Sequence, residues 1–172
     1  MGKPPQEPYE PDLPDEYAPQ RELATLVDAI VQDVDAANLR NPRLDLRRVV
    51  VRGCRLTGAE LAESTFVDVA FENCRLDLAA LRFAQLERVV FRDCRMNACD
   101  LYDAVLKDVL LERCDLREAT LTGVKAERVE LRACALAGAR GADALRGARM
   151  PWNDVIENAA VFATALGIEI VD

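Results

Sequence analysis

Cysteine is the most chemically reactive residue type in this sequence, and five of the six cysteines recur at every twentieth position: Cys54, Cys74, Cys94, Cys114 and Cys134. Cysteines that bind a metal ion converge on one point, usually through short spacings such as C-x-x-C. A constant interval instead arranges them in a row, where parallel side chains disfavour disulfide geometry and each cysteine acts as a small apolar residue. The spacing therefore favours core packing over metal or redox chemistry. It also predicts reduced thiols and a cytoplasmic location.

The remaining residues give little support for catalysis. The chain contains no histidine, which removes the commonest general base and a favoured zinc ligand. No nucleophile, base and pocket converge in the sequence pattern, so we expect no enzyme activity and no cofactor. No run of 18 apolar residues is present, so we expect no membrane-spanning segment.

The same interval also governs valine, in the series Val49, Val69, Val89, Val109 and Val129. Within it lies a period of five, in which a large apolar residue recurs from Leu46 to Leu136 and a small residue stands two positions earlier. Helical patterns do not produce a period of five, whereas residues two apart in a short strand point to the same side. Glycines such as Gly53 and Gly58 fall outside the strand positions and turn the corners. Four such units make one coil, and successive coils stack on one another.

The five-residue units resemble those of the pentapeptide-repeat family. Clear examples are Ala59-Glu60-Leu61, Cys74-Arg75-Leu76, Cys99-Asp100-Leu101 and Cys114-Asp115-Leu116. The resemblance covers residues 44–150 and implies an all-β fold, a right-handed quadrilateral β-helix. We expect about five coils over residues 46–150, flanked by N-terminal and C-terminal α-helices. A distant resemblance to the quinolone-resistance members implies DNA gyrase as the most specific candidate partner.

The N-terminal part divides into two expected segments. Residues 1–20 are rich in proline and acidic residues, which predicts a disordered tail. Residues 21–45 contain apolar residues at helical spacing, among them Leu23, Leu26 and Ile30, which predicts a capping helix and a lead-in to the first coil.

The C-terminal segment, residues 151–172, predicts a helix capped by Asn153 or Asp154 and ended by Gly167, followed by a short strand at Ile168 and Ile170. The helix either caps the last coil or also forms a homodimer interface. Its resemblance to the C-terminal helix through which quinolone-protection members pair implies the second role. The candidate dimer residues are Val155, Ile156, Ala159, Phe162 and Leu166.

We call the wall of the coil that contains Val49, Val69, Val89, Val109 and Val129 the valine wall. Two rows of charge flank its outer face. The first rail is Arg48, Asp68, Arg88, Asp108 and Arg128; the second rail is Arg52, Glu72, Arg92, Glu112 and Arg132. Alternating signs predict ion pairs between stacked coils, which stabilise the fold and its register. Between the rails lies an outward-facing apolar stripe, which is a candidate interaction surface: Val50, Ala70, Val90 and Leu110. A smaller candidate surface consists of Leu78, Phe83 and Tyr102 in adjacent coils.

The charge balance argues against imitation of DNA. The chain has a net charge of −8, but residues 46–150 carry 18 Lys/Arg against 16 Asp/Glu, so the negative charge lies at the ends. A DNA mimic needs its negative charge along the rod. The leading hypothesis is therefore a non-enzymatic protein-interaction module, with gyrase as the most specific partner and no direct nucleic-acid binding. The alternative is a structural or regulatory scaffold whose acidic tail recruits a partner.

Overall fold

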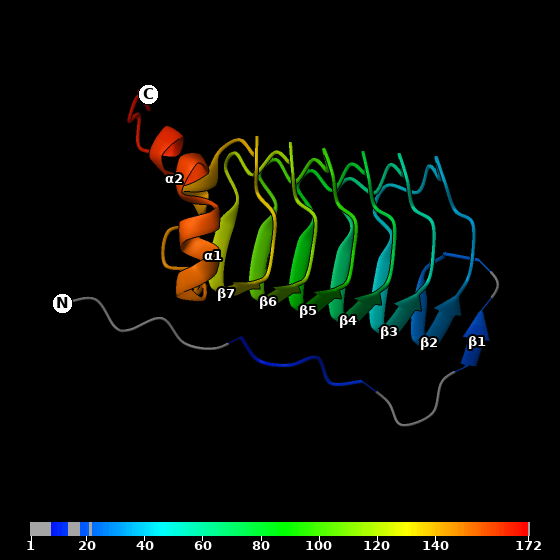
Figure 1. Ribbon diagram of the computed structural model, residues 1–172. Helices are drawn as coiled ribbons and strands as arrows, with labels where there is room; N and C mark the ends of the chain where they lie inside the picture. The colour runs from blue at the N-terminus through cyan, green and yellow to red at the C-terminus, as the bar shows by residue number, and fades with distance from the viewer. Residues whose placement is uncertain (1–7, 14–17, 21, 172) are drawn as a thin grey trace.

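The computed structural model describes residues 8–13, 18–20 and 22–171. Within these ranges, seven parallel strands form one sheet in chain order (Figure 1). They are β1 (Ala18–Gln20), β2 (Leu26–Gln32), β3 (Asp45–Arg52), β4 (Thr65–Glu72), β5 (Gln85–Arg92), β6 (Val105–Glu112) and β7 (Lys125–Arg132). From β2 onward each strand pairs with the next in the register of the repeat, as Val49 does with Val69. Isolated bridges such as Arg55 to Arg75 and Glu60 to Ala80 repeat this pairing on the other walls. The chain is therefore a parallel β-helix, as predicted.

The corners of the coil recur every five residues and have left-handed backbone conformation. Gly53 and Gly58 have φ of 62° and 68°, and a Cβ added there would lie only 2.4 Å and 2.6 Å from a side-chain oxygen of the preceding coil. Other corners carry residues with a Cβ, for example Arg48 at φ 55° and Leu78 at φ 60°. Asn, Asp and Gly accept this conformation, whereas a bulky side chain is unusual there.

The interior of the rod is filled by its own side chains. Large residues such as Leu56, Leu61 and Phe66 are fully buried, and the rings of Phe71 and Phe91 stack with centroids 4.9 Å apart. The enclosed apolar cavity that remains has a volume of about 10 Å³. That volume is at the lower limit for a single water molecule, and its lining offers no polar partner. Any ligand must therefore bind outside the rod.

The predicted N-terminal capping helix over residues 21–45 is wrong. Residues 26–32 form β2, which pairs in register with β3, and bridges at Asp35 and Arg40 continue the coil. Leu26, Val31 and Val34 satisfy the five-residue period as well as a helical one. Pairing with the open edge of β3 satisfies backbone hydrogen bonds that a helix would leave exposed. The β-helix thus begins one coil earlier than expected, and β1 with the buried Leu23 covers its first end.

The prediction of a disordered tail over residues 1–20 is also wrong for those of its residues that the structure describes. Residues 8–13 run along the stack of strands, and residues 18–20 form β1 (Figure 1). The remainder of the predicted tail, residues 1–7 and 14–17, lies outside the described residues. The described part of this segment contacts the outer face of the valine wall, as detailed below.

The C-terminal end consists of a 3₁₀ helix η1 (Ala142–Leu145) and two short helices, α1 (Trp152–Glu157) and α2 (Ala159–Ala165), which lie beyond β7 (Figure 1). Gly167, at φ 75°, follows the end of α2 as predicted. The predicted caps are wrong: the N-cap of α1 is Pro151. The predicted strand at Ile168 and Ile170 is also wrong, because these residues follow the helix without forming a strand. No helix in the described part of the chain has the length and apolar character needed to span a membrane.

Candidate interaction surfaces

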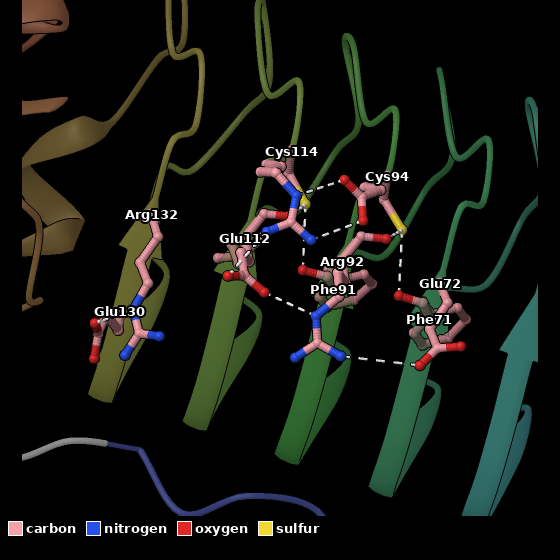
Figure 2. Close-up of polar contacts among 12 residues, drawn as sticks. Phe71, Glu72, Phe91, Arg92, Cys94, Glu112, Cys114, Glu130 and Arg132 are labelled. Carbon is pink, nitrogen blue, oxygen red and sulfur yellow. Dashed lines mark hydrogen bonds and ion pairs between the residues drawn. The ribbon is translucent and has the colours of Figure 1, made fainter.

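The cysteine ladder lies inside the rod. All six cysteines are buried and free. The single S–H of each ladder thiol lies within hydrogen-bond distance of two backbone carbonyls; Cys94 Sγ lies 3.4 Å from the Phe71 oxygen and 3.3 Å from the Arg92 oxygen (Figure 2). Burial raises the pKa of Cys99 to about 12. The described residues contain no group of three His, Cys, Asp or Glu side chains arranged to hold a metal ion. These thiols therefore serve the packing of the wall.

The second rail is an ion-pair ladder on the surface. Figure 2 shows Arg92 between Glu72 and Glu112, at 4.0 Å and 2.8 Å. Arg52 pairs with Glu72 at 2.8 Å. Arg132 departs from the predicted pattern, because its guanidinium contacts Glu130 on its own strand. These charges therefore neutralise one another along the rod.

The first rail is divided into separate pairs rather than a continuous ladder. Arg88 contacts Asp68 at 2.6 Å, and Arg128 contacts Asp108 at 2.6 Å, in each case one coil earlier. Arg48 reaches Asp28 in the same way, at 2.6 Å. Sequence reasoning missed Asp28, although counting back one coil from Arg48 identifies it as the next charge of opposite sign.

The carboxylates of Asp68 and Asp108 are buried, and each also accepts a backbone hydrogen bond from the N-terminal segment. Tyr9 N–H donates to Asp108 Oδ1 at 3.1 Å, and Asp12 N–H donates to Asp68 Oδ1 at 3.0 Å. Burial acts to raise the pKa of Asp108, but the hydrogen bonds from Arg128 and from the Tyr9 amide outweigh it and lower the pKa overall. The pKa of Asp68 is lowered against burial in the same way, by Arg88 and the Asp12 amide. Both groups are therefore charged acceptors.

The N-terminal segment covers the apolar stripe between the rails. Val50, Ala70 and Val90 are buried, and Leu110 is half-buried. A cavity of about 130 Å³ remains between Pro11 and Leu13 of the segment and the stripe residues. The expectation that the stripe is exposed is therefore wrong, because residues 8–13 lie over it.

We call the smaller predicted surface, Leu78, Phe83 and Tyr102, the corner patch; Leu78 and Phe83 are exposed and Tyr102 is half-buried. Leu78 and Phe83 are 64% and 47% exposed and occupy two successive corners, at φ 60° and 59°. The rings of Phe83 and Tyr102 meet edge to face with centroids 5.8 Å apart. The Arg82 guanidinium lies 5.2 Å from the centre of the Tyr102 ring and forms an ion pair with Asp100 at 2.9 Å. The structure thus gathers Phe83, Tyr102 and Arg82 at one corner, and the exposed Leu78 stands at the preceding corner.

The C-terminal end is fixed to the last coil by Asn158, between α1 and α2. Its Oδ1 accepts from Leu136 N–H at 2.8 Å, and its Nδ2 donates to the Cys134 oxygen at 3.0 Å. Asp154, predicted as a helix cap, instead accepts from Ala133 N–H at 2.5 Å. These side chains satisfy backbone groups at the open edge of the final coil. Sequence reasoning missed Asn158, whose only signal was a polar residue interrupting an apolar helical pattern.

The predicted dimer residues fall into two groups. Ile156, Ala159 and Leu166 are exposed, whereas Val155 and Phe162 are half-buried. Phe162 packs against the core at the end of the rod and lines an open pocket of about 330 Å³ next to η1. Trp152 is also exposed, at 74%. Phe162 therefore belongs to the cap, and the exposed apolar residues of this end remain unpartnered in the described chain.

The family model of the pentapeptide repeat region matches residues 44–121 and 64–140 of this chain. The chain therefore belongs to the pentapeptide repeat family, whose β-helix the register above displays. Its description as a pentapeptide repeat protein rests on this match and on the observed coil.

Similar solved structures include a trypsin-treated form of QnrB1, a plasmid-mediated fluoroquinolone resistance protein, with 15% identity, 88% of this chain and 94% of that chain covered, and a TM-score of 0.37. Another is a pentapeptide repeat protein from the Arabidopsis thaliana thylakoid lumen, with 18% identity, coverage of 76% and 74%, and a TM-score of 0.34. A third is HetL from the cyanobacterium Nostoc, involved in heterocyst differentiation regulation, with 16% identity, coverage of 77% and 92%, and a TM-score of 0.27. Among curated proteins, none matches this chain significantly.

Proposed function

We propose that this protein is a non-enzymatic protein-interaction module, a rigid rod that binds partner proteins through its exposed apolar surfaces. The observation that carries the proposal is the corner patch. Leu78 and Phe83 stand at left-handed corners, where backbone preference favours Gly, Asn or Asp, and both are largely exposed. Neither backbone conformation nor core packing accounts for large apolar side chains there.

The surroundings of the patch support a protein partner. Exposed aromatic and arginine side chains are enriched among the residues that dominate protein–protein binding. Phe83, Tyr102 and Arg82 supply both types within one small area. The filled interior and the paired charges of the rod favour binding over catalysis as its role. The free thiols fit the reducing cytoplasm that we propose as its location.

The test replaces Leu78 and Phe83 together by asparagine, which accepts the left-handed conformation. Full-length wild type and variant are used as baits in extracts of the native host, and bound proteins are quantified by mass spectrometry. The matched control is Glu118→Asn, at an equivalent corner with φ 59°. We expect a partner retained by wild type and control and depleted at least tenfold on the double variant. An identical set of bound proteins on all three baits contradicts a role for the patch.

DNA gyrase is the most specific partner that we propose, on the basis of family resemblance. The paired rails do not present the continuous negative surface of a DNA mimic, so we place the gyrase contact on the corner patch or the C-terminal end. A supercoiling assay with purified gyrase tests this version. We expect the wild-type protein to inhibit supercoiling. We expect the Leu78/Phe83 variant, or the C-terminal variant described below, to lose this inhibition. If the protein shows no inhibition of supercoiling and gives no protection from a quinolone, the gyrase proposal is refuted. The broader proposal of a protein-interaction module is unaffected by that result.

We further propose a homodimer through the C-terminal end. Leu166 is 71% exposed, and Ile156 is exposed on the neighbouring helix. Changing both to aspartate should convert a dimer to a monomer in sedimentation equilibrium without disturbing the core. Phe162→Asp is a poorer test, because Phe162 packs on the core and its loss affects folding. Equal masses for wild type and the Ile156/Leu166 variant contradict the dimer proposal.

A further inference from the structure

The outer face of the valine wall carries a peptide-shaped occupant, the chain's own residues 8–13. This segment crosses the strands along the axis of the rod (Figure 1). Its backbone contacts Asp108 on β6 at Tyr9 and Asp68 on β4 at Asp12. Three residues of the segment therefore span two coils of the rod.

The spacing of this contact matches a polyproline II helix. Pro5, Pro8, Pro11 and Pro14 recur every three residues in the sequence, and the described Pro8 and Pro11 are both half-buried. A polyproline II helix has three residues per turn and advances about 9.3 Å per turn. Two coils of a β-helix are about 9.6 Å apart at the usual strand spacing. Because the buried acidic residues of the first rail alternate with arginines, they also recur every two coils, so each turn of such a helix meets one carboxylate.

The pairing uses the backbone donors that a proline-rich segment retains. Proline has no N–H, and the two donors are the residues directly after Pro8 and Pro11. Asp68 and Asp108 are held charged by their arginine partners, which makes them strong acceptors. The first rail thus binds the backbone N–H groups of a segment that has proline at every third position.

Two arginines add side-chain selectivity. Arg48 Nη1 contacts Asp12 Oδ2 at 2.7 Å, and the Arg128 guanidinium lies 5.4 Å from the centre of the Tyr9 ring. An acidic residue and an aromatic residue, each following a proline, are therefore the side chains that this face recognises. Both contacts lie at the surface, where such pairs are screened by solvent and each contributes little on its own.

The resident segment fills its site incompletely. The cavity of about 130 Å³ beside Pro11 and Leu13 is lined by Ala70, Val90 and Leu110 of the stripe, and by Glu72 and Arg92 of the second rail. A ligand with a larger apolar side chain at the position of Leu13 would bury more of this stripe. An occupant held by two hydrogen bonds, two exposed side-chain contacts and loose packing is displaceable.

We propose that the valine-wall face is a binding groove for proline-rich acidic segments of partner proteins in the polyproline II conformation, and that residues 8–13 are its resident intramolecular ligand. The proposal goes beyond the interaction role proposed above, because it concerns another face and specifies the chemistry of the partner. It also gives the N-terminal segment a regulatory role, since a partner segment must displace it.

The test uses a fluorescein-labelled peptide with the sequence of residues 6–14 and measures its binding by fluorescence anisotropy. The full-length protein is compared with a full-length variant, Tyr9→Ser with Asp12→Ser, whose resident segment has lost both side-chain contacts. Both positions are exposed, so the fold is retained. We expect the variant to bind the peptide at least tenfold more tightly than wild type does. A peptide with Pro8 and Pro11 changed to alanine should bind the variant at least fivefold more weakly.

A double-mutant cycle locates the peptide in the groove. We call the Tyr9→Ser, Asp12→Ser protein the open variant. Adding Arg48→Gln to it should lower its affinity for the wild-type peptide. The same change should alter its affinity for a peptide with Asp12→Asn by less than twofold. Glu118→Gln, on another face, is the matched control and should change neither affinity. No binding by the open variant, equal affinity for it and wild type, or an absent cycle coupling would each overturn the proposal. None of these results bears on the pull-down with the Leu78/Phe83 variant, so the two proposals fail separately.

Discussion

Replacing Leu78 by glycine separates the needs of folding from those of binding at the corner patch. Leu78 is 64% exposed with φ 60°, and its backbone N–H donates to the Asn97 oxygen at 2.9 Å, a bond that glycine retains. Left-handed conformation costs an ordinary residue about 1–2 kcal/mol, which glycine avoids. Against this, glycine loses about 0.5–1 kcal/mol more backbone entropy on folding. Full burial of leucine contributes about 1.5–3 kcal/mol, so a side chain one-third buried loses about 0.5–1 kcal/mol on removal.

These contributions nearly cancel, so Leu78→Gly should change the free energy of unfolding by less than about 1 kcal/mol. Denaturant titration measures the change, and the melting temperature should move by less than about 4 °C. Glu118→Gly, at an equivalent corner with φ 59°, is the matched control. By contrast, Leu76→Ala removes a fully buried side chain and should cost about 2–5 kcal/mol.

The prediction couples this small stability change to a large loss of partner binding by Leu78→Gly and none by Glu118→Gly. A loss of more than about 2 kcal/mol for Leu78→Gly would show that Leu78 is retained to stabilise the rod, since losses of that size belong to core packing. Preserved stability with preserved binding would equally refute the reasoning, because the exposed leucine would then have neither role.

Three further outcomes are expected. A thiol reagent should modify none of the six buried cysteines until the protein is denatured, and rapid reaction of the folded protein would contradict the packing described. Because the pKa of Asp108 is lowered in the folded state, its stabilisation is present above the unfolded pKa of about 3.9 and lost as pH falls through the folded pKa. Acid titration should therefore show a smaller loss of stability below pH of about 4 in Asp108→Asn than in wild type, and identical curves would refute this. Asn158→Ala leaves Leu136 N–H without its acceptor and should cost about 1–3 kcal/mol in thermal unfolding, whereas the exposed Asn153→Ala should cost nearly nothing.

The interior of the rod was predictable because its period is incompatible with a helix. Every fifth residue must point inward for the coil to close, so Cys94, Phe71 and Val89 are placed by counting alone. The first coil escaped this reasoning because Leu26, Val31 and Val34 satisfy helical spacing and the coil register together. The deciding factor is the open edge of β3, whose unpaired backbone groups β2 satisfies. Local spacing does not contain that tertiary requirement.

The N-terminal segment and Asn158 were unpredictable for a different reason. Acidic and proline-rich composition favours disorder when the segment is considered alone. Its ordering depends on carboxylates and arginines far away in the sequence, such as Arg48, 36 residues from Asp12, and Asp108, 99 residues from Tyr9. Asn158 likewise accepts a hydrogen bond from the backbone N–H of Leu136, 22 residues earlier, at the open edge of the last coil. Such contacts depend on the ends and the outer faces of the rod. Because these parts of the molecule do not follow the repeat, counting along the sequence does not predict their contacts.

A repeat of this regularity supplies its own controls, because each position has counterparts one coil away in nearly the same environment. At the corner of Leu78 the neighbouring coils carry Gly58 and Ala98, so the backbone there does not require a large side chain. At the stripe position of Leu110, the next coil carries Glu130, buried and paired with Arg132, where the apolar stripe ends. A residue that resembles its counterparts one coil away is explained by the needs of the coil. A residue that differs from those counterparts, and gains no stabilising contact by the difference, requires another explanation. By that criterion, the exposed corner patch is the strongest candidate for selection by a partner.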